Sequence, residues 1–254
     1  MRDFEGKVVL VTGASRLIGS SVARSLGKRG AAVVINYLSG KDRAEEVAAS
    51  IESAGGRAMI LKADVRNRAE VRAMVEQTVS AFGGLDILVN NARQIHSKKP
   101  FLETDWDQDV WPQMSVHLGG AFNCCQEAIP RMMERRGGAI VNMLSSAFRN
   151  ANARLHAYGP AKAALRNFTM NLALEFGPAG IRVNSVTPGN TGTPDSPSRL
   201  RSAAEVDELR QKAPLRRIAD PDDIAEAVVF LCSDGARHIT GADIAVNGGA
   251  LLTL

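Results

Sequence analysis

The sequence predicts an α/β protein built on a single doubly wound parallel sheet with helices on both faces. Short runs of β-branched and other apolar residues alternate with longer segments of helical spacing along the whole chain. The apolar runs are nearly continuous, which is typical of parallel strands that are buried on both faces. Right-handed crossovers between such strands produce a doubly wound sheet. We expect one domain over residues 1–254, because a chain of this length buries a large core.

Seven runs have the composition of strands, and most of the segments between them have helical spacing. The expected strands are 8–12, 31–35, 58–61, 86–89, 139–143, 181–186 and 242–246. The expected helices are 16–28, 43–54, 69–82, 106–133 (mostly helical), 158–176 and 221–232. The least regular stretch is 188–214, which is rich in Pro, Thr, Ser and Gly. A segment of this length is either disordered or a functional lid, and we expect it to be the substrate loop.

Composition and charge argue against several other classes of protein. Hydrophobic residues make up 45% and charged residues 23%, as in ordinary globular domains. No apolar run approaches the roughly 18 residues of a membrane span, and the first eight residues lack the apolar region of a signal peptide. The net charge of +4 comes from scattered basic residues, so it does not indicate a nucleic-acid partner. Three cysteines are too few for a disulfide framework, which favours a cytoplasmic location.

A glycine-containing loop joins the first expected strand to the first helix. Residues 12–19 read Thr-Gly-Ala-Ser-Arg-Leu-Ile-Gly. Glycine permits a tight turn after the strand, and the helix N-terminus presents free N–H groups to a pyrophosphate. The alternative is an ordinary glycine turn, but the position in the first βα unit favours a nucleotide site. The cofactor contacts expected from this loop are Gly13, Ser15, Arg16, Leu17 and Ile18.

Tyr158 and Lys162 are the central candidates for chemistry. They lie four residues apart in an expected helix, so their side chains project from the same face. A phenol with a pKa near 10 exchanges protons poorly at neutral pH, but a nearby ammonium stabilises the phenolate and lowers that pKa. Tyr158 would then give a proton to a carbonyl oxygen as hydride arrives, or take one from an alcohol. The alternative is a surface pair with no chemical role, which would show the same four-residue spacing.

Taken together, these motifs resemble those of the short-chain dehydrogenase/reductase family. Within the family, the sequence most resembles the 3-oxoacyl-carrier-protein reductases. The family motif Thr-Gly-x-x-x-Gly-x-Gly is matched at Thr12, Gly13 and Gly19, and the resemblance extends over nearly the whole chain. It implies a Rossmann-type fold and a nicotinamide cofactor. It also implies that Ser145, thirteen residues before Tyr158, orients the carbonyl, with Ser146 as the alternative.

The same resemblance assigns further cofactor contacts. Asp64 and Val65 match the segment that binds the adenine, although Asp64 also has the character of a helix cap. Asn91 and Ala92 follow the fourth expected strand, as in the family's Asn-Asn-Ala-Gly motif. The contacts expected at the nicotinamide carboxamide are Pro188, Gly189 and Thr193. Tyr158 and Lys162 are also expected to contact the cofactor, and Lys162 to bind the nicotinamide ribose.

Three positions depart from the family pattern. Leu17 replaces the middle glycine of the cofactor motif, at a cost of roughly 1–2 kcal/mol if its φ is positive. Arg93 replaces the glycine of Asn-Asn-Ala-Gly, where it would contact phosphate, line the substrate mouth or face solvent. His117 stands where the family has an Asn that holds a water of the proton relay. His donates and accepts hydrogen bonds, so we expect His117 to keep that role, with simple packing as the alternative.

The residues around the second strand favour NADP over NAD. A site selective for NAD usually has an acid there to bind the ribose 2′-hydroxyl, but residues 35–40 contain none. This stretch includes Asn36, which we expect to contact the cofactor. Arg16 lies in the loop, and a 2′-phosphate gains about 1.5–3 kcal/mol from such a cation. A solvated Arg16 is the alternative.

The sequence therefore predicts an NADP-dependent oxidoreductase that transfers a hydride between the cofactor and a small carbonyl or secondary alcohol, with a 3-oxoacyl compound as one candidate substrate. The expected catalytic residues are Ser145, Tyr158, Lys162 and His117. A pteridine reductase-like enzyme and a sensor without catalysis remain as alternatives. An enoyl reductase is disfavoured, since those relatives have Lys seven residues after the Tyr and position 165 is Leu.

We expect a homotetramer, with no membrane or nucleic-acid partner. The resemblance implies that the long helical segments 106–133 and 158–176 form one interface, and that the C-terminal segment forms the other. We predict no metal site, because the four histidines lie on different elements and none is paired with Cys at ligand spacing.

Overall fold

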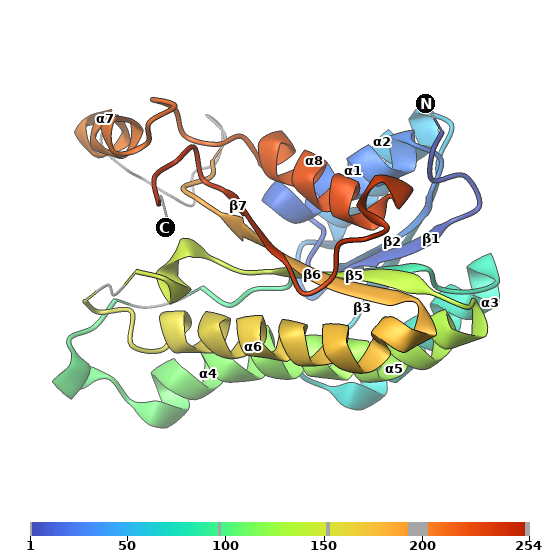
Figure 1. Cartoon of the computed structure of the whole chain (residues 1–254), viewed down its shortest axis with the longest axis horizontal. Coiled ribbons are helices and arrows are strands. Elements are labelled where there is room, and N and C mark those ends of the chain that lie inside the picture. Colours follow the sequence, from blue (N-terminus) through green and yellow to red (C-terminus); the bar gives the residue numbers. More distant parts are fainter. Residues whose placement is uncertain (1, 96–97, 151–152, 193–202, 252–254) are drawn as a thin grey trace.

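The computed structural model describes residues 2–95, 98–150, 153–192 and 203–251 (Figure 1). Within these residues, seven strands form one parallel sheet in the order β3-β2-β1-β4-β5-β6-β7. The strands are β1 (Val8–Val11), β2 (Ala32–Tyr37), β3 (Arg57–Lys62), β4 (Ile87–Asn90), β5 (Gly138–Met143), β6 (Ile181–Pro188) and β7 (Asp243–Val246). The predicted fold class is confirmed. The strand order reverses between β1 and β4, which creates a crevice at their carboxyl ends.

Helices cover the two faces of the sheet. The covering helices are α1 (Leu17–Lys28), α2 (Lys41–Ser53), α3 (Arg68–Phe82), α4 (Trp111–Met114), α5 (Ala121–Glu134), α6 (Tyr158–Phe176) and α8 (Pro221–Cys232), whereas α7 (Ala203–Lys212) lies away from the sheet (Figure 1). Figure 1 shows α1, α2 and α8 on one side of the sheet, and α4, α5 and α6 on the other. Each face therefore has its own helical layer, as the apolar strands require.

The core is divided between the two faces by the alternation of side chains along each strand. On β1, Val9 and Val11 pack in the cluster that includes α1, α2 and α8. The residues between them, Val8 and Leu10, pack in the cluster that includes α3, α5 and α6. Successive side chains of a strand point to opposite faces, so a central strand must be apolar throughout. This explains why the strands read as continuous apolar runs.

Two segments differ from the expected elements. The single helical segment expected over 106–133 is divided by π-helical turns, η2 (Trp106–Val110) and η3 (Ser115–Gly120), which flank α4. The stretch 188–214 was expected to be irregular, but it contains α7. Short 3-10 helices also occur, including η1 (Phe101–Glu103) and η4 (Ser146–Phe148). Among the described residues, no helix is long and apolar enough to cross a membrane.

Candidate active site

The loop after β1 lies directly against the segment after β4. Gly13 has φ +60°, and an added Cβ there would lie 2.9 Å from the Ala92 Cα. A Cβ at Gly19 would lie 2.5 Å from the Asn91 side-chain nitrogen. The backbone N–H groups of Asn91 and Ala92 both donate to Thr12 Oγ1, at 2.9 and 3.0 Å. The two glycines are therefore required by close approach between the crevice walls.

Asn36 supports the loop with its side chain. Its Oδ1 accepts a hydrogen bond from the Gly13 N–H at 3.1 Å. Its Nδ2 donates to the carbonyl oxygens of Leu61 and Ala63, at 3.3 and 3.0 Å. These bonds tie the loop to the ends of β2 and β3. The Asn36 amide is therefore already engaged with the chain itself.

Leu17 has a left-handed backbone. Its φ is +50°, whereas Arg16 immediately before it is extended, with φ −163°. The Ser20 hydroxyl donates to the Leu17 carbonyl oxygen at 2.8 Å, which holds the turn at the start of α1. The conformation is the one that favours glycine, so Leu17 carries the backbone strain considered from the sequence.

A cavity of about 320 Å³ lies at the carboxyl ends of β1, β2, β3 and β4. The lining residues are Gly13, Ser15, Arg16, Leu17, Ile18, Asn36, Tyr37, Leu38, Ser39, Ala63, Asp64, Val65, Arg66, Asn91, Ala92, Arg93, Gln94, Ile95, Val116 and Thr191. The set includes every cofactor contact expected from the β1 loop, from β2 and from the segments after β3 and β4. The structure therefore brings the expected adenosine and phosphate contacts together.

Three arginines bring positive charge to this cavity. Arg16 and Arg93 line it, and the Arg43 guanidinium lies beside Gly40, just after β2. Partial burial lowers the pKa of Arg16, and the charges of Arg93 and Arg43 lower it further. In the described part of the chain, none of the three forms an ion pair with a carboxylate. They are suited to an anionic ligand, and the sequence analysis missed Arg43 because helical spacing alone does not place it there.

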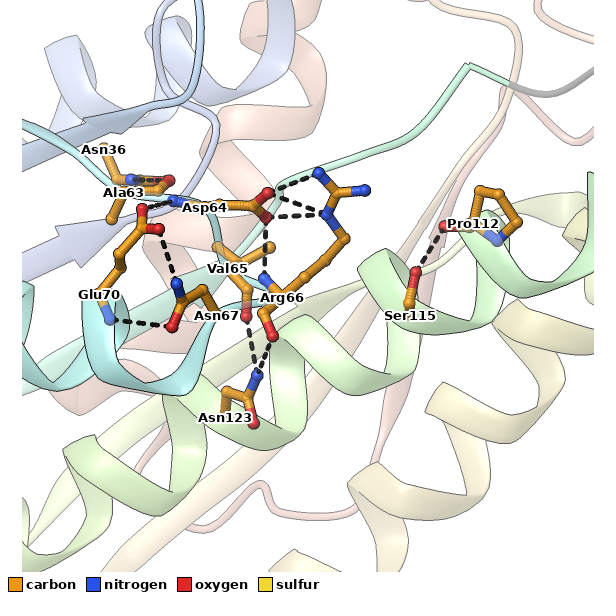
Figure 2. A network of polar contacts seen from close by, with 10 residues as sticks. All are labelled: Asn36, Ala63, Asp64, Val65, Arg66, Asn67, Glu70, Pro112, Ser115 and Asn123. Atoms are coloured by element: carbon orange, nitrogen blue, oxygen red, sulfur yellow. Dashed lines mark hydrogen bonds and ion pairs between the residues drawn. The ribbon is translucent and has the colours of Figure 1, made fainter. Parts of the chain in front are cut away.

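Asp64 belongs to a polar network beside the cavity (Figure 2). The Arg66 guanidinium donates to both of its carboxylate oxygens, with distances of 2.5 to 3.0 Å. These bonds hold the pKa of the Asp64 carboxyl below its ordinary value. The N-cap of α3 is Asn67, whose side chain accepts from two backbone N–H groups. Asp64 is therefore not the helix cap, and with Val65 it remains at the cavity wall.

Lys162 and Tyr158 occupy the first turns of α6. Lys162 is buried, and its Nζ donates to the Met143 carbonyl oxygen at 2.6 Å. The same Nζ lies 5.9 Å from the centre of the Tyr158 ring. Burial of the ammonium, together with the charge of Arg93, lowers the pKa of Lys162 to about 7. The two side chains share one environment, as their spacing predicted.

His117 also contacts Tyr158, from the π-helical segment η3. Its ring is buried and meets the Tyr158 ring edge to face, with ring centres 5.3 Å apart. His117 and Lys162 both line a second, very small chamber of about 10 Å³. That volume is about what one water molecule requires. The expected grouping of His117 with Tyr158 and Lys162 is present in the structure.

Ser145 begins the turn that follows β5. Its Oγ accepts a hydrogen bond from the Ala147 N–H at 3.3 Å, and the backbone then forms η4. An added Cβ at Gly159 would lie 2.9 Å from the Ala147 carbonyl oxygen. The serine turn therefore packs directly against the first turn of α6, next to Tyr158.

Pro188 ends β6, and Gly189 follows it. The Gly189 N–H donates to the Val246 carbonyl oxygen at 2.9 Å, and an added Cβ would lie 2.8 Å from the Asn247 Cα. Thr193, the third residue expected near the nicotinamide, lies outside the described residues. Within the described ranges, no group of three or more His, Cys, Asp or Glu side chains could hold a metal ion.

The site fits a dinucleotide. Gly13 and Gly19 permit close contact between the crevice walls, Arg16 and Arg93 line the cavity, and the charge of Arg43 lies close enough to act on Arg16. A hydroxyl, a phenol and a buried lysine lie at the ends of β5 and at the start of α6, beyond the phosphate loop. This is the arrangement of an oxidoreductase with a nicotinamide cofactor.

Comparison with known proteins agrees with this arrangement. A family model described as enoyl-(acyl carrier protein) reductase matches residues 13–250. The chain belongs to the short-chain dehydrogenase/reductase family, as the sequence motifs predicted, and it is an oxidoreductase of the CH–OH/C=O type.

Individual relatives span nearly the whole chain. The chain is 38% identical to a 3-oxoacyl-(acyl-carrier-protein) reductase of Staphylococcus epidermidis, over 96% of this chain and 98% of that protein. It is 36% identical to a cis-4-hydroxycyclohexanecarboxylate dehydrogenase of Sinomonas cyclohexanicum, over 97% of both chains. A solved 7α-hydroxysteroid dehydrogenase, in complex with NADH and a 7-oxo bile acid conjugate, superposes with a TM-score of 0.93 at 32% identity, covering 100% of this chain and 97% of that one.

Proposed function

We propose that the protein is an NADP-dependent reductase or dehydrogenase that interconverts a ketone and a secondary alcohol. The observation that carries the proposal is the buried Lys162, whose Nζ is held by the Met143 carbonyl 5.9 Å from the centre of the Tyr158 ring. An ammonium at this position lowers the pKa of a phenol, which is what a tyrosine needs to act as an acid or base near neutral pH.

Each protein group has a defined task in this reaction. The nicotinamide ring of the bound cofactor supplies or accepts the hydride. In the reductive direction, the hydroxyl of Tyr158 donates its proton to the substrate oxygen as the carbonyl carbon gains the hydride. Ser145 donates a hydrogen bond to the same oxygen and stabilises the charge that develops there. Lys162 favours the phenolate, and His117 would hold a relay water in the small chamber that it lines together with Lys162.

The charge around the cavity supports NADP as the cofactor. β2 ends at Tyr37, and no acid follows it before Gly40. Arg16 and Arg43 lie on this side of the cavity, where they would bind a 2′-phosphate. Gly13, Ser15 and Ile18 would lie along the pyrophosphate, with Asp64 and Val65 at the adenine and Asn91 and Ala92 at the riboses. Pro188, Gly189 and Thr193 would contact the carboxamide.

The names of the relatives favour a ketone or secondary alcohol as the substrate. The relatives compared above are named for a 3-oxoacyl group, a ring hydroxyl and a steroid hydroxyl. In each case the reacting group is a secondary alcohol or the corresponding ketone. We propose 3-oxoacyl thioesters as the first compounds to test, because a relative that is 38% identical over 96% of this chain is named for that group.

We also propose that the enzyme is a homotetramer in a reducing compartment such as the cytoplasm. Phe122 of α5 and both Met170 and Leu174 of α6 are exposed apolar side chains on the helical layer below the sheet in Figure 1. Exposed apolar faces of this kind are typical of subunit interfaces. The three cysteines are buried and unpaired, which favours a reducing environment.

The proposed function is tested by Tyr158→Phe. Purified wild-type protein should oxidise NADPH when mixed with a panel of ketones that includes a 3-oxoacyl thioester. Tyr158→Phe should lower turnover by at least about 100-fold, because the general acid is lost. NADPH binding, measured by cofactor fluorescence, should stay nearly unchanged, since the loop after β1 and Lys162 remain in place. Lys162→Ala should weaken both turnover and binding. Substantial turnover by Tyr158→Phe would contradict the assignment of the acid.

A further inference from the structure

Arg149 and Asp243 form an ion pair outside the proposed catalytic set. The Arg149 Nη2 lies 2.8 Å from the Asp243 Oδ2, and the Asp243 side chain is only 2% exposed. A buried carboxylate is costly unless it is paired and hydrogen-bonded. The pair joins residues that are 94 positions apart in the sequence, so it fixes the relative position of two distant segments.

Asp243 connects the pair to the sheet. Its Oδ1 accepts hydrogen bonds from Ser185 Oγ at 2.9 Å and from Thr187 Oγ1 at 2.8 Å. Ser185 and Thr187 lie on β6, and Asp243 is the first residue of β7, paired in register with Ser185. β6 ends one residue after Thr187, at Pro188. The carboxylate is therefore anchored at the end of β6 that leads to the proposed nicotinamide contacts.

Arg149 connects the pair to the serine turn. Ser145 caps the turn, and the Phe148 and Arg149 N–H groups donate to the carbonyl oxygens of Ser145 and Ser146, at 3.2 and 3.1 Å. These bonds make residues 145–149 a short, internally bonded unit with Ser145 at one end and Arg149 at the other. The Arg149 guanidinium also lies over the Phe148 ring, 5.2 Å from its centre, which restricts its orientation.

We propose that Arg149 and Asp243 are positioning residues that hold Ser145 at the correct distance from the nicotinamide end of β6. This inference rests on the proposed function, because Ser145 is assigned there to the substrate oxygen. The turn also packs on α6 at Gly159, so its displacement would move Ser145 relative to Tyr158. Small misplacements of a group that contacts the reacting atom have large effects on rate.

The first test is Arg149→Gln, measured for kcat, KM, the NADPH dissociation constant and the melting temperature. We expect kcat to fall by about 10- to 100-fold because Ser145 is misplaced. The NADPH dissociation constant should change little, since the adenosine and phosphate contacts lie at β1 to β4. Arg149→Lys keeps the charge and should recover part of the lost kcat. Arg29→Gln is the matched control: it breaks the ion pairs with Glu226 and Asp3, away from the site, and should leave kcat unchanged.

The second test repeats Arg149→Gln in a Ser145→Ala background. If Arg149 acts through Ser145, the substitution should cost little further turnover there, whereas a general structural role gives the same fold-loss in both backgrounds. Equal losses in the two backgrounds would overturn the proposal, as would an unchanged kcat in Arg149→Gln. If Arg149→Gln folds poorly, Asp243→Asn breaks the pair while keeping the side-chain shape and should give the same kinetic pattern.

These outcomes separate this inference from the proposed function. If Ser145→Ala kept full turnover, both the proposed role of Ser145 and the proposed positioning role of Arg149 and Asp243 would be contradicted. A large loss in Ser145→Ala, combined with equal effects of Arg149→Gln in both backgrounds, would leave the proposed function intact and overturn only the role of Arg149 and Asp243.

Discussion

At the scale of single residues, Leu17 combines a side chain with a backbone that suits glycine. A residue with a Cβ in the left-handed region costs roughly 1–2 kcal/mol, and the φ of Leu17 is +50°. The loop before α1 has little room to relax, because it packs closely against Ala92 at Gly13 and against Asn91 at Gly19. The strain is therefore localised in the proposed phosphate loop.

The strain predicts a difference between two substitutions at this position. Leu17→Gly and Leu17→Ala both remove the leucine side chain, but only glycine relieves the left-handed backbone. We expect Leu17→Gly to be more stable than Leu17→Ala by about 1 kcal/mol in the free energy of unfolding, measured by denaturant titration. Equal stabilities would mean that the loop relaxes at residue 17 without strain.

Arg16 is the residue on which the cofactor preference mainly depends. Arg16→Ala should weaken NADPH binding by about 1.5–3 kcal/mol, or roughly 10- to 150-fold, because a charge-assisted bond to the 2′-phosphate is lost. NADH lacks that phosphate, so its dissociation constant should stay nearly the same. Lys28→Ala, at the far end of α1, is the control for a general loss of positive charge. A fixed ratio of the two dissociation constants would show that Arg16 is only solvated.

A substitution that shifts the cofactor preference from NADPH toward NADH should be made at Tyr37 rather than at Asn36. The Asn36 amide makes three hydrogen bonds within the chain, and a carboxylate there would face the Leu61 and Ala63 carbonyl oxygens that it now donates to. Tyr37 ends β2 and lines the cavity. Tyr37→Asp should therefore shift the preference toward NADH, since a carboxylate repels the 2′-phosphate and binds a 2′-hydroxyl.

At the scale of elements, periodicity predicted the strands and most helices because their apolar residues follow one face or one strand. It did not predict the π-helical turns that divide residues 106–133, since the spacing of apolar residues over a single turn does not distinguish i→i+5 from i→i+4 hydrogen bonding. α7 was missed because its helix-forming residues lie in a stretch that is otherwise rich in turn-forming residues. The sequence also predicted which segments meet at the crevice, because the motifs at Gly13, Asp64 and Asn91 each follow a strand.

The contacts that sequence analysis missed are long-range ones. The charge of Arg43 in α2 acts on Arg16 in the loop after β1, and Arg149 pairs with Asp243 across 94 residues. Neither residue belongs to a local pattern, so only the folded arrangement shows its place. The support that Asn36 gives to the loop is of the same kind, because it joins the ends of β2 and β3 to the turn after β1.

The exposed apolar side chains of α5 and α6 predict which substitution should disrupt the proposed oligomer. Met170 and Leu174 lie four residues apart on α6, and Leu174 is 83% exposed. Phe122 of α5 is a further exposed apolar side chain of this helical layer, and its ring packs on Phe168 of α6 with ring centres 5.7 Å apart. Leu174→Glu should lower the mass measured by light scattering, because it places a charge in a buried interface.

Glu175→Ala is the control for the oligomer, because it changes the neighbouring exposed residue of the same helix. It should leave the mass unchanged. A wild-type protein that is monomeric at micromolar concentration would contradict the proposed assembly, and an unchanged mass in Leu174→Glu would move the interface away from this face.

At the scale of the whole molecule, the burial of Lys162 that the proposed function requires lowers the folding stability in a pH-dependent way. Its pKa falls from an ordinary value of 10.5 to about 7 in the folded protein. Between these two values the unfolded chain binds more protons at this group than the folded one, so the folding stability it contributes rises with pH. The penalty for holding the ammonium in the core is complete below about pH 7 and disappears above the unfolded pKa.

Lys162→Met should therefore stabilise the fold in a pH-dependent way while abolishing turnover. The gain in the free energy of unfolding over wild type should be largest near pH 7, on the order of a few kcal/mol, and should shrink toward about pH 10. The trend with pH, rather than the value at one pH, tests the penalty, because the bond to the Met143 carbonyl is lost at every pH. Lys28→Met, at an exposed lysine in the last turn of α1, should show no such trend. A stability difference between Lys162→Met and wild type that stays constant with pH would mean that Lys162 is charged in the folded enzyme throughout this range. Its burial would then be offset by a partner, and the ammonium would be available to Tyr158 before the cofactor binds.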